Sequence, residues 1–201
     1  EGLPFLEAIR QFQFDVGREH ILYLHVTLVP YLQAAGELKT KPTQHSVKEL
    51  RALGIQPDIL LCRSTHELSD ELKNKISLFC NIRPHEVISV PDVDTIYSLP
   101  LVLQEEGLDQ LIAEKLNIWS RPARLKKWFD VVEKIRYPTH KIKIAIVGKY
   151  TDLHESYKSL NESLTHAGVC SDCRVERVYI EAEDIAKGNV DAFDEIDGIL
   201  V

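Results

Sequence analysis

Residues 58–62 read DILLC, a short apolar run without polar alternation, which is typical of a strand buried on both faces of a parallel sheet. Helical periodicity lies on both sides of it, at residues 42–53 and 69–80, and Gly54 supplies a stop signal for the first helix. Residues 86–90 (EVISV) predict the next strand. This alternation predicts an α/β fold with doubly wound, mostly parallel sheets.

The same pattern extends in both directions from this centre. Residues 20–31 (HILYLHVTLVPY) predict an earlier strand and its exit, and residues 101–116 predict one acidic helix. In the helix that follows DILLC, we expect Leu72, Ile76 and Phe79 to form the stripe that faces the core.

A second alternating unit begins after a basic segment. Residues 119–141 carry seven basic and two acidic side chains and predict an inter-domain linker, with an amphipathic helix at 125–135. Further strands and helices are predicted at residues 142–147, 153–164, 175–180, 182–187 and 196–201. We therefore predict a first domain at 1–118, a linker at 119–141 and the start of a second domain at 142–201.

Composition and charge restrict the class of protein. The 201 residues are 44% hydrophobic and 27% charged, as expected of a soluble globular protein, and no run approaches the ~20 apolar residues of a membrane helix. The net charge of -7 argues against nucleic acid as a main partner. Residues 151–201 hold 12 acidic and 4 basic side chains, a net of -8, so the first 150 residues sum to +1. A small anionic ligand is therefore compatible with the first region.

The cysteines and the chain ends give further expectations. Cys62 and Cys80 lie in apolar runs and are expected to be reduced core residues, which favours the cytosol. Cys170 and Cys173 form a lone CxxC before a predicted strand, and we interpret them as loop thiols rather than a zinc or redox site. The start of the chain does not resemble a signal peptide. The lack of methionine and the final run GILV indicate a chain truncated at both ends.

Polar residues follow three predicted strands of the first region, and parallel strands would bring them to one edge of the sheet. The first segment is KTKPTQ, at the start of a helix. A helix start offers unpaired N–H groups and partial positive charge, so two lysines there predict a polyphosphate site. An ordinary helix start with two solvated lysines is the alternative. The candidate residues are Lys39, Thr40, Lys41, Pro42, Thr43 and Gln44.

Two other strand ends and one helix contribute further candidates. The candidates at the strand ends are Arg63, Pro91, Asp92 and Val93. Arg63 could instead pair with Asp58 or Glu67 without any ligand. Lys75 flanks the apolar stripe of its helix and could add a positive charge to the site. The alternative is a surface lysine whose aliphatic stem covers the core. Residues 147–150 (VGKY) lack the upstream glycine and the Ser or Thr of a phosphate-binding P-loop, so we reject that interpretation.

Several of these segments resemble the CTP synthase family, in the same order and over essentially the whole chain. The most specific is GELKTKPTQHSVKEL at residues 36–50. The other matching segments are PFLEAIRQ at 4–11, HVT at 25–27, GIQPD at 54–58, CR at 62–63, KISLFC at 75–80, VDTIY at 93–97 and IVGKY at 146–150.

The resemblance implies an enzyme of two coupled domains. A P-loop amidoligase domain uses ATP and Mg²⁺ to phosphorylate O4 of UTP, and ammonia then displaces the phosphate to form CTP. A class I glutamine amidotransferase domain, which is flavodoxin-like, releases that ammonia from glutamine. The resemblance also implies activation by GTP, inhibition by CTP, a homotetramer and a cytoplasmic location.

The residue roles that the resemblance implies agree with the strand ends. Residues 39–44 would bind UTP and CTP, chiefly through the triphosphate, and Lys75 would add a further positive charge. Glu1 would contact the pyrimidine or ribose of CTP. The segment 91–93 would hold the adenine of ATP, with Arg63 beside it.

The family's catalytic motifs lie outside the chain. The P-loop and the magnesium ligands would precede Glu1, and the glutaminase Cys–His–Glu triad would follow Val201. We therefore expect no catalytic or metal-ligating residue here, and no activity from the chain alone. Two alternatives of other classes are a non-catalytic nucleotide-binding or assembly module, and a flavodoxin-like redox domain that uses Cys170 and Cys173.

Overall fold

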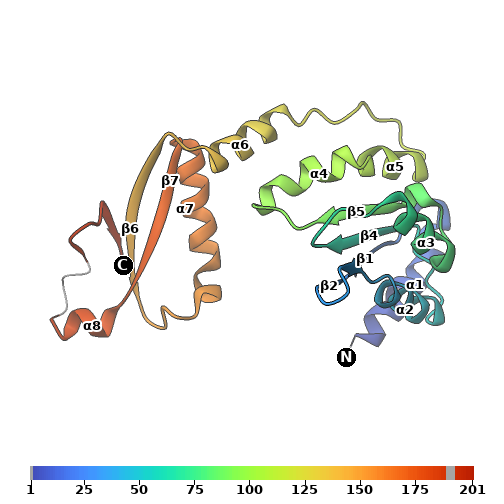
Figure 1. Ribbon diagram of the computed structural model, residues 1–201, viewed down its shortest axis with the longest axis horizontal. Coiled ribbons are helices and arrows are strands. Elements are labelled where there is room, and N and C mark those ends of the chain that lie inside the picture. Colours follow the sequence, from blue (N-terminus) through green and yellow to red (C-terminus); the bar gives the residue numbers. More distant parts are fainter. Residues whose placement is uncertain (1, 189–192) are drawn as a thin grey trace. The chain divides into compact units, whose positions relative to one another are not determined.

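The computed structural model describes residues 2–188 and 193–201. The chain divides into two compact units, Glu1–Leu125 and Lys126–Val201, and the boundary lies inside the segment 119–141. Each unit contains a three-stranded parallel sheet (Figure 1). This confirms the predicted α/β class with parallel sheets. Within the described residues, no helix combines the length and the apolar character needed to cross a membrane.

Most predicted strands and helices of the first unit are present, with ends that differ by a few residues. Its strands are β1 (Leu24–Leu28), β2 (Tyr31–Leu32), β3 (Glu37–Leu38), β4 (Ile59–Ser64) and β5 (Val87–Pro91). Its α-helices are α1 (Leu3–Val16), α2 (Lys41–Ala52), α3 (Asp70–Cys80), α4 (Leu99–Glu105) and α5 (Leu108–Lys115). Short 3-10 helices are η1 (Arg18–His20), η2 (Pro84–Glu86) and η3 (Ile96–Ser98).

The DILLC segment forms the centre of the first sheet. The strand order is β1-β4-β5, with Leu24 opposite Ile59 and Leu60 opposite Val87. Helices cover both faces of the sheet, with α4 and α5 on one side and α2 and α3 on the other (Figure 1). Burial on both faces explains why this strand has a continuous apolar sequence. The two apolar layers comprise Val29, Val47, Leu60, Cys62, Leu68, Ile76, Cys80 and Val87 on one face, and Ile59, Ile88, Leu108 and Leu111 on the other.

Two details of the helices differ from the prediction. The predicted single helix at 101–116 is two helices, because Gly107 adopts a φ of 76° between α4 and α5, a conformation that suits glycine. Phe79 does not face the core, since it is 57% exposed. The buried stripe of α3 contains Ile76 and Cys80, four residues apart, and Phe79 lies about 100° around the helix from Cys80.

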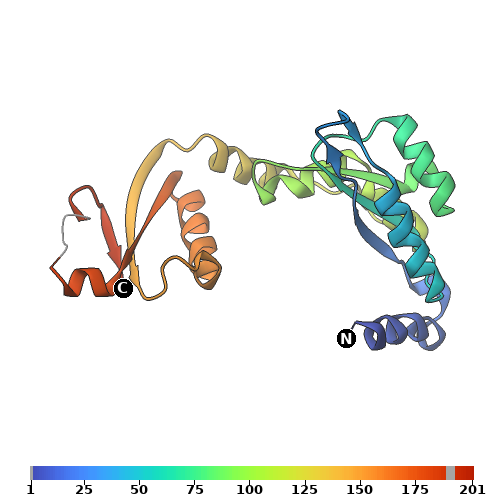
Figure 2. The same ribbon diagram turned by 60° about the horizontal axis from the view of Figure 1, so that its bottom comes forward.

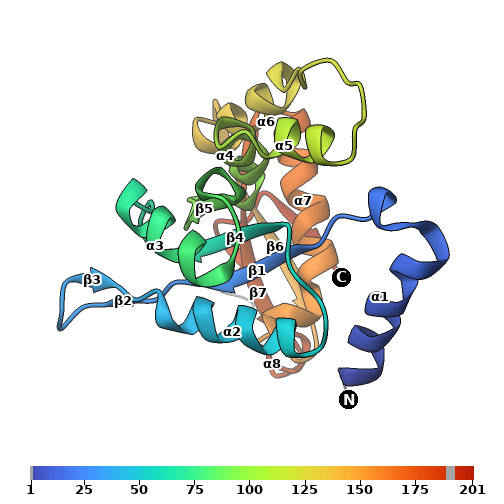
Figure 3. The ribbon, with the colours of Figure 1, turned by 90° about the vertical axis from the view of Figure 1, so that its right-hand side faces the viewer.

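Helix α1 and the β2–β3 hairpin were not predicted from the pattern. Helix α1 has no buried residue and lies to one side of the first sheet (Figure 2). The hydroxyl of Tyr23 donates a hydrogen bond of 3.3 Å to the carbonyl of Ile9 in α1. The hairpin connects β1 to α2 (Figure 3). Its strands contain two residues each, which is too short for an alternating pattern to be recognised.

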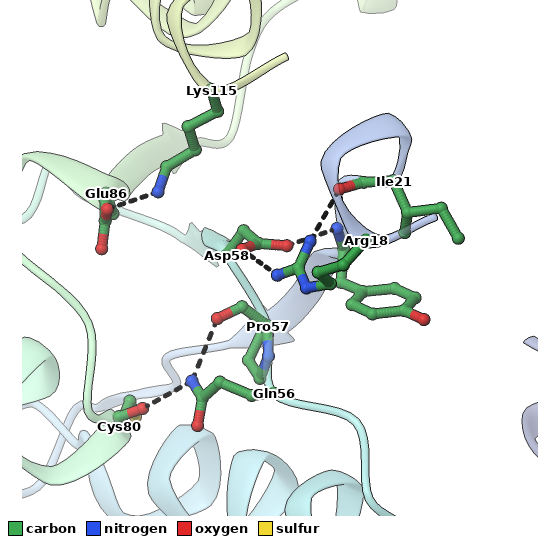
Figure 4. A network of polar contacts seen from close by, with 9 residues as sticks. Arg18, Ile21, Gln56, Pro57, Asp58, Cys80, Glu86 and Lys115 are labelled. Atoms are coloured by element: carbon green, nitrogen blue, oxygen red, sulfur yellow. Dashed lines mark hydrogen bonds and ion pairs between the residues drawn. The ribbon is translucent and has the colours of Figure 1, made fainter. Parts of the chain in front are cut away.

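Polar contacts hold the amino end of the first sheet together (Figure 4). The Asp58 carboxylate, just before β4, accepts hydrogen bonds from the Arg18 guanidinium at 2.5 Å and from the Tyr23 backbone N–H at 2.9 Å. On the other side, the Gln56 amide donates to the carbonyl oxygens of Pro57 and Cys80, at 3.0 and 3.2 Å. These contacts fix the chain where it enters β4. Asp58 is paired at this end of the sheet, whereas Arg63 lies at the opposite end.

The second unit is built around a long central strand. Its elements are α6 (Lys126–Arg136), β6 (His140–Gly148), η4 (His154–Tyr157), α7 (Lys158–Cys170), β7 (Cys173–Glu181), α8 (Ala182–Ala186) and β8 (Gly198–Leu200). The strand order is β7-β6-β8, all parallel. A Cβ at Gly168 would lie 2.4 Å from the Cys173 carbonyl oxygen, so glycine allows α7 and β7 to approach closely at their connection.

The cysteines should differ sharply in reactivity. Cys62 and Cys80 are buried as predicted, and burial raises the pKa of each thiol to about 11. At pH 8 only about one thousandth of such a thiol is ionised, and the thiolate is the reactive form. We expect iodoacetamide to label the exposed Cys170 in the folded protein, and Cys62 and Cys80 only after unfolding. Peptide mass spectrometry measures this, and alkylation of Cys62 in folded protein would contradict the predicted burial.

Candidate functional site

The carboxyl ends of β1, β4 and β5 meet at one edge of the first sheet, as the sequence predicts. The backbone N–H of Val29, just after β1, donates to the carbonyl of Arg63 at 2.8 Å. The backbone N–H of Asp92, just after β5, donates to the carbonyl of Ser64 at 2.8 Å. The three segments that contain the candidate residues therefore leave the sheet side by side.

Helix α2 begins directly above the end of β1. The buried Thr43 hydroxyl lies 3.1 Å from the Leu28 carbonyl oxygen and 3.2 Å from Thr27 Oγ1. The backbone N–H of Lys39 donates to the Pro30 carbonyl at 2.9 Å. These contacts anchor the first turn of α2 to the sheet edge. A helix start placed there presents its N–H groups and partial positive charge to the space beyond the strands.

The Thr43 hydroxyl anchors the helix start to the sheet edge. Replacing Thr43 by valine keeps the side-chain shape but removes the hydrogen-bonding group, and it leaves the Leu28 carbonyl without this contact. We expect the free energy of unfolding to fall by about 1–2 kcal/mol. Urea denaturation measures this effect. The matched control is Thr65→Val, at an exposed position after β4, which should change stability by less than about 0.5 kcal/mol. Equal losses in both variants would show that the Thr43 contacts add nothing.

Two other residues of KTKPTQ contact one another. Thr40 is buried, and its hydroxyl accepts a hydrogen bond of 3.1 Å from the Gln44 amide. The Thr40 side chain makes no capping hydrogen bond to the helix. Pro42 lies in the first turn, where its missing N–H removes no helical bond. Lys41 is exposed. The start of α2 is therefore not capped by its own N-cap side chain.

Three charged side chains lie near this helix start. The Lys39 ammonium forms an ion pair with the Glu37 carboxylate of β3. This hydrogen bond and the charge of Lys39 lower the pKa of Glu37, and the positive charge of Lys75 in α3 lowers it further. Lys39 and Lys75 thus act on the same carboxylate, although 36 positions separate them in the chain.

The second group of candidates lines a groove on the same sheet edge. Arg63, Pro91, Asp92 and Val93 lie around a cavity with a volume of about 520 Å³. Arg63 Nε is 3.3 Å from Asp92 Oδ1, so the arginine pairs with neither Asp58 nor Glu67, the alternatives considered from the sequence. Asp58 pairs with Arg18 at 2.5 Å (Figure 4).

The apolar part of this groove was missed by the sequence analysis. The lining residues that were not predicted are Val26, Leu61, Val90, Ile96, Leu99 and Leu103. Val26 and Ile96 are each 64% exposed, which is unusual for apolar side chains at the edge of a core. The periodicity of β1 could not reveal this, because an apolar residue that lines a groove and one that lies in the core give the same sequence pattern. The lining of the groove thus combines apolar side chains with one guanidinium and one carboxylate.

The other residues considered from the sequence are Glu1 and the cysteine pair Cys170 and Cys173. Glu1 lies outside the described residues. Among the described residues, no three or more His, Cys, Asp or Glu side chains are placed so that they could hold a metal ion. Cys170 is exposed, and Cys173 Sγ lies 3.7 Å from the Arg174 carbonyl oxygen.

Comparison with known proteins shows the family to which the chain belongs. The family described as CTP synthase N-terminus matches residues 1–118. The proteins named CTP synthase from Trichlorobacter lovleyi and Pelobacter propionicus are each 58% identical to this chain over 203 aligned residues. The one from Clostridium perfringens is 55% identical over 202 residues. Each match covers 100% of this chain, which spans 38% of the length of each relative. The chain belongs to the CTP synthase family.

Proposed function

We propose that this chain is the central part of an enzyme that forms CTP from UTP, using ATP and ammonia. In this reaction, ATP transfers its terminal phosphate to O4 of UTP, and ammonia then displaces that phosphate. The products are CTP, ADP and inorganic phosphate. The observation that carries the proposal is the start of α2, which Thr43 anchors to the Leu28 carbonyl at the end of β1, with the Lys39–Glu37 ion pair beside it.

The start of α2 is the proposed site for the triphosphate of UTP or of CTP. Phosphate oxygens accept hydrogen bonds from backbone N–H groups at a helix start and pair with lysine ammonium groups. Lys39 and Lys41 extend from this turn, and Lys75 supplies a further charge from α3. Glu1 is proposed to contact the pyrimidine or ribose of CTP.

The groove beside Arg63 is the proposed site for the adenine of ATP. Its floor offers Leu61, Val90 and Leu103 to a flat aromatic ring. The exposed guanidinium of Arg63 can stack on the face of such a ring. The backbone of residues 91–93 can supply hydrogen bonds to ring nitrogens. Both proposed nucleotide sites thus lie at the carboxyl edge of one sheet, as is usual for ligands of open α/β folds.

The other components of the reaction are proposed to lie outside this chain. The ligands of Mg²⁺ are proposed to precede Glu1. The second unit is proposed to begin a glutaminase domain, which releases ammonia from glutamine and responds to GTP. A homotetramer in the cytoplasm is the proposed working form. The chain alone is proposed to lack synthase and glutaminase activity.

An assay of the full reading frame tests this function. The protein is incubated with UTP, ATP, Mg²⁺ and ammonia, and CTP formation is followed by chromatography. The proposal predicts CTP formation that requires both UTP and ATP. If a folded protein binds UTP and forms no CTP, the non-catalytic nucleotide-binding or assembly module becomes the better account.

A further inference from the structure

Glu37 is placed at the proposed triphosphate site by a fixed turn. It opens β3, which pairs with β2 in an antiparallel hairpin, with Leu32 opposite Glu37 and Tyr31 opposite Leu38. The preceding Gly36 has a φ of 64°, and its N–H donates to the Leu32 carbonyl at 2.8 Å. The ring of Tyr31 packs edge-on against that of His66, after β4, with centroids 4.8 Å apart. The position of Glu37 is therefore set by the hairpin.

The partners of Glu37 are the lysines proposed to bind phosphate. Its carboxylate forms an ion pair with Lys39, and the charge of Lys75 also acts on it. The side chains of Glu37 and Lys39 remain 58% and 39% exposed, so an incoming ligand can reach both. A carboxylate and a phosphate oxygen are both anionic acceptors, and they compete for the same ammonium group.

We propose that Glu37 is a built-in counter-ion of the triphosphate site, which pairs with Lys39 until the phosphates of a nucleoside triphosphate replace it. This inference rests on the function proposed above for residues 39–44. Without ligand, Glu37 offsets the repulsion between lysines gathered at one helix start. When the triphosphate binds, the carboxylate loses its partner and repels the phosphates. Glu37 thus weakens nucleotide binding and helps to set the affinity of the site.

The size of the effect follows from the exposure of the pair. An exposed ion pair is weak, so removing it should change the affinity by no more than about fivefold. Replacing Glu37 by glutamine keeps the length of the side chain and removes the charge. We therefore expect Glu37→Gln to lower the Kd for UTP by about fivefold at low salt, and by less at high salt because the interaction is screened.

Calorimetric titration of the full-length protein with UTP tests the inference. The matched control is Glu49→Gln, which removes an exposed carboxylate from the other end of α2 and should leave the Kd unchanged. The gain from Glu37→Gln should also shrink in a Lys39→Ala background, since the two side chains act on each other. Titration with uridine, which has no phosphate, should not respond to Glu37→Gln.

The outcomes separate this inference from the proposed function. If Lys39→Ala weakens UTP binding while Glu37→Gln leaves it unchanged or weaker, the counter-ion role is wrong and the site remains. If neither substitution changes UTP binding, the triphosphate does not bind at residues 39–44, and both proposals are overturned.

Discussion

Replacing Lys39 by alanine should weaken the binding of UTP by about one to two orders of magnitude. A charge-assisted contact to a phosphate contributes about 1.5–3 kcal/mol, which corresponds to roughly 10- to 150-fold in affinity. Lys39 is suited to such a contact because its backbone N–H is fixed to Pro30 at 2.9 Å, just before the start of α2. Calorimetric titration of the full-length protein measures the change.

The control for Lys39→Ala is Lys48→Ala. Lys48 is an exposed lysine in the middle of α2, nine positions after Lys39, so its removal changes the net charge equally. It should leave UTP affinity within about twofold, since exposed charges more than a Debye length apart interact weakly. Binding of ATP at the Arg63 groove should respond to neither variant. Equal losses of UTP affinity in both variants would show a general effect of charge instead of a contact with Lys39.

Replacing Glu86 by glutamine should lower the free energy of unfolding of the first unit by roughly 2 kcal/mol at pH 7. The Glu86 side chain is 9% exposed and accepts hydrogen bonds from Lys115 Nζ at 2.5 Å (Figure 4) and from the Arg83 backbone N–H at 2.6 Å. These contacts join η2 to α5. The substitution leaves the partly buried Lys115 without its counter-charge. Urea denaturation followed by circular dichroism measures the loss.

The stability that Glu86 contributes should also depend on pH. Burial alone would raise the pKa of this carboxyl group, but the hydrogen bonds from Arg83 and Lys115 hold it below its ordinary value of 4.5. A carboxyl group with a lowered pKa stabilises the folded state above the unfolded-state pKa, and this contribution is lost as the pH falls through the folded-state pKa. The difference between wild type and Glu86→Gln should therefore be constant near pH 7 and shrink below about pH 4.5.

The control for this prediction is Glu114→Gln, an exposed position in α5 next to Lys115. It should change stability by less than about 0.5 kcal/mol at every pH. A difference between wild type and Glu86→Gln that grows as the pH falls would have the wrong sign and would rule out the ionised, hydrogen-bonded carboxylate as its cause.

Much of the first sheet could be predicted because its elements carry strong local signals. Residues 59–62 (ILLC) are apolar throughout since β4 is buried on both faces, and the start of α2 combines Pro42 with a polar turn. The break between α4 and α5 could not be predicted from periodicity, because the apolar residues on either side of Gly107 keep the spacing of one continuous helix. The exposure of Phe79 depends on which neighbouring row of α3 packs on the sheet, and that is a tertiary choice.

The candidate residues that lie at the ends of the strands could be grouped from the sequence. Parallel pairing brings the residues after β1, β4 and β5 to one edge whatever the loops contain, so residues 39–44 and Arg63 could be grouped from the sequence. The effect of the Lys75 charge on the pKa of Glu37 could not be predicted, since it depends on how the hairpin folds relative to α3. The apolar floor of the groove was hidden for a similar reason: Val26 looks like a core residue in sequence and is exposed in the fold.

The most direct test of the triphosphate site is hydrogen exchange of the full-length protein with and without UTP, resolved by peptide. Backbone amides that bind phosphate exchange more slowly, and Lys41 and Thr43 lie in the first turn of α2, where backbone N–H groups have no helical acceptor. We predict that UTP slows exchange in peptides that contain residues 39–44, and that Lys39→Ala removes this protection at the same UTP concentration. Unchanged exchange at residues 39–44 with protection elsewhere in the protein would contradict the proposed site.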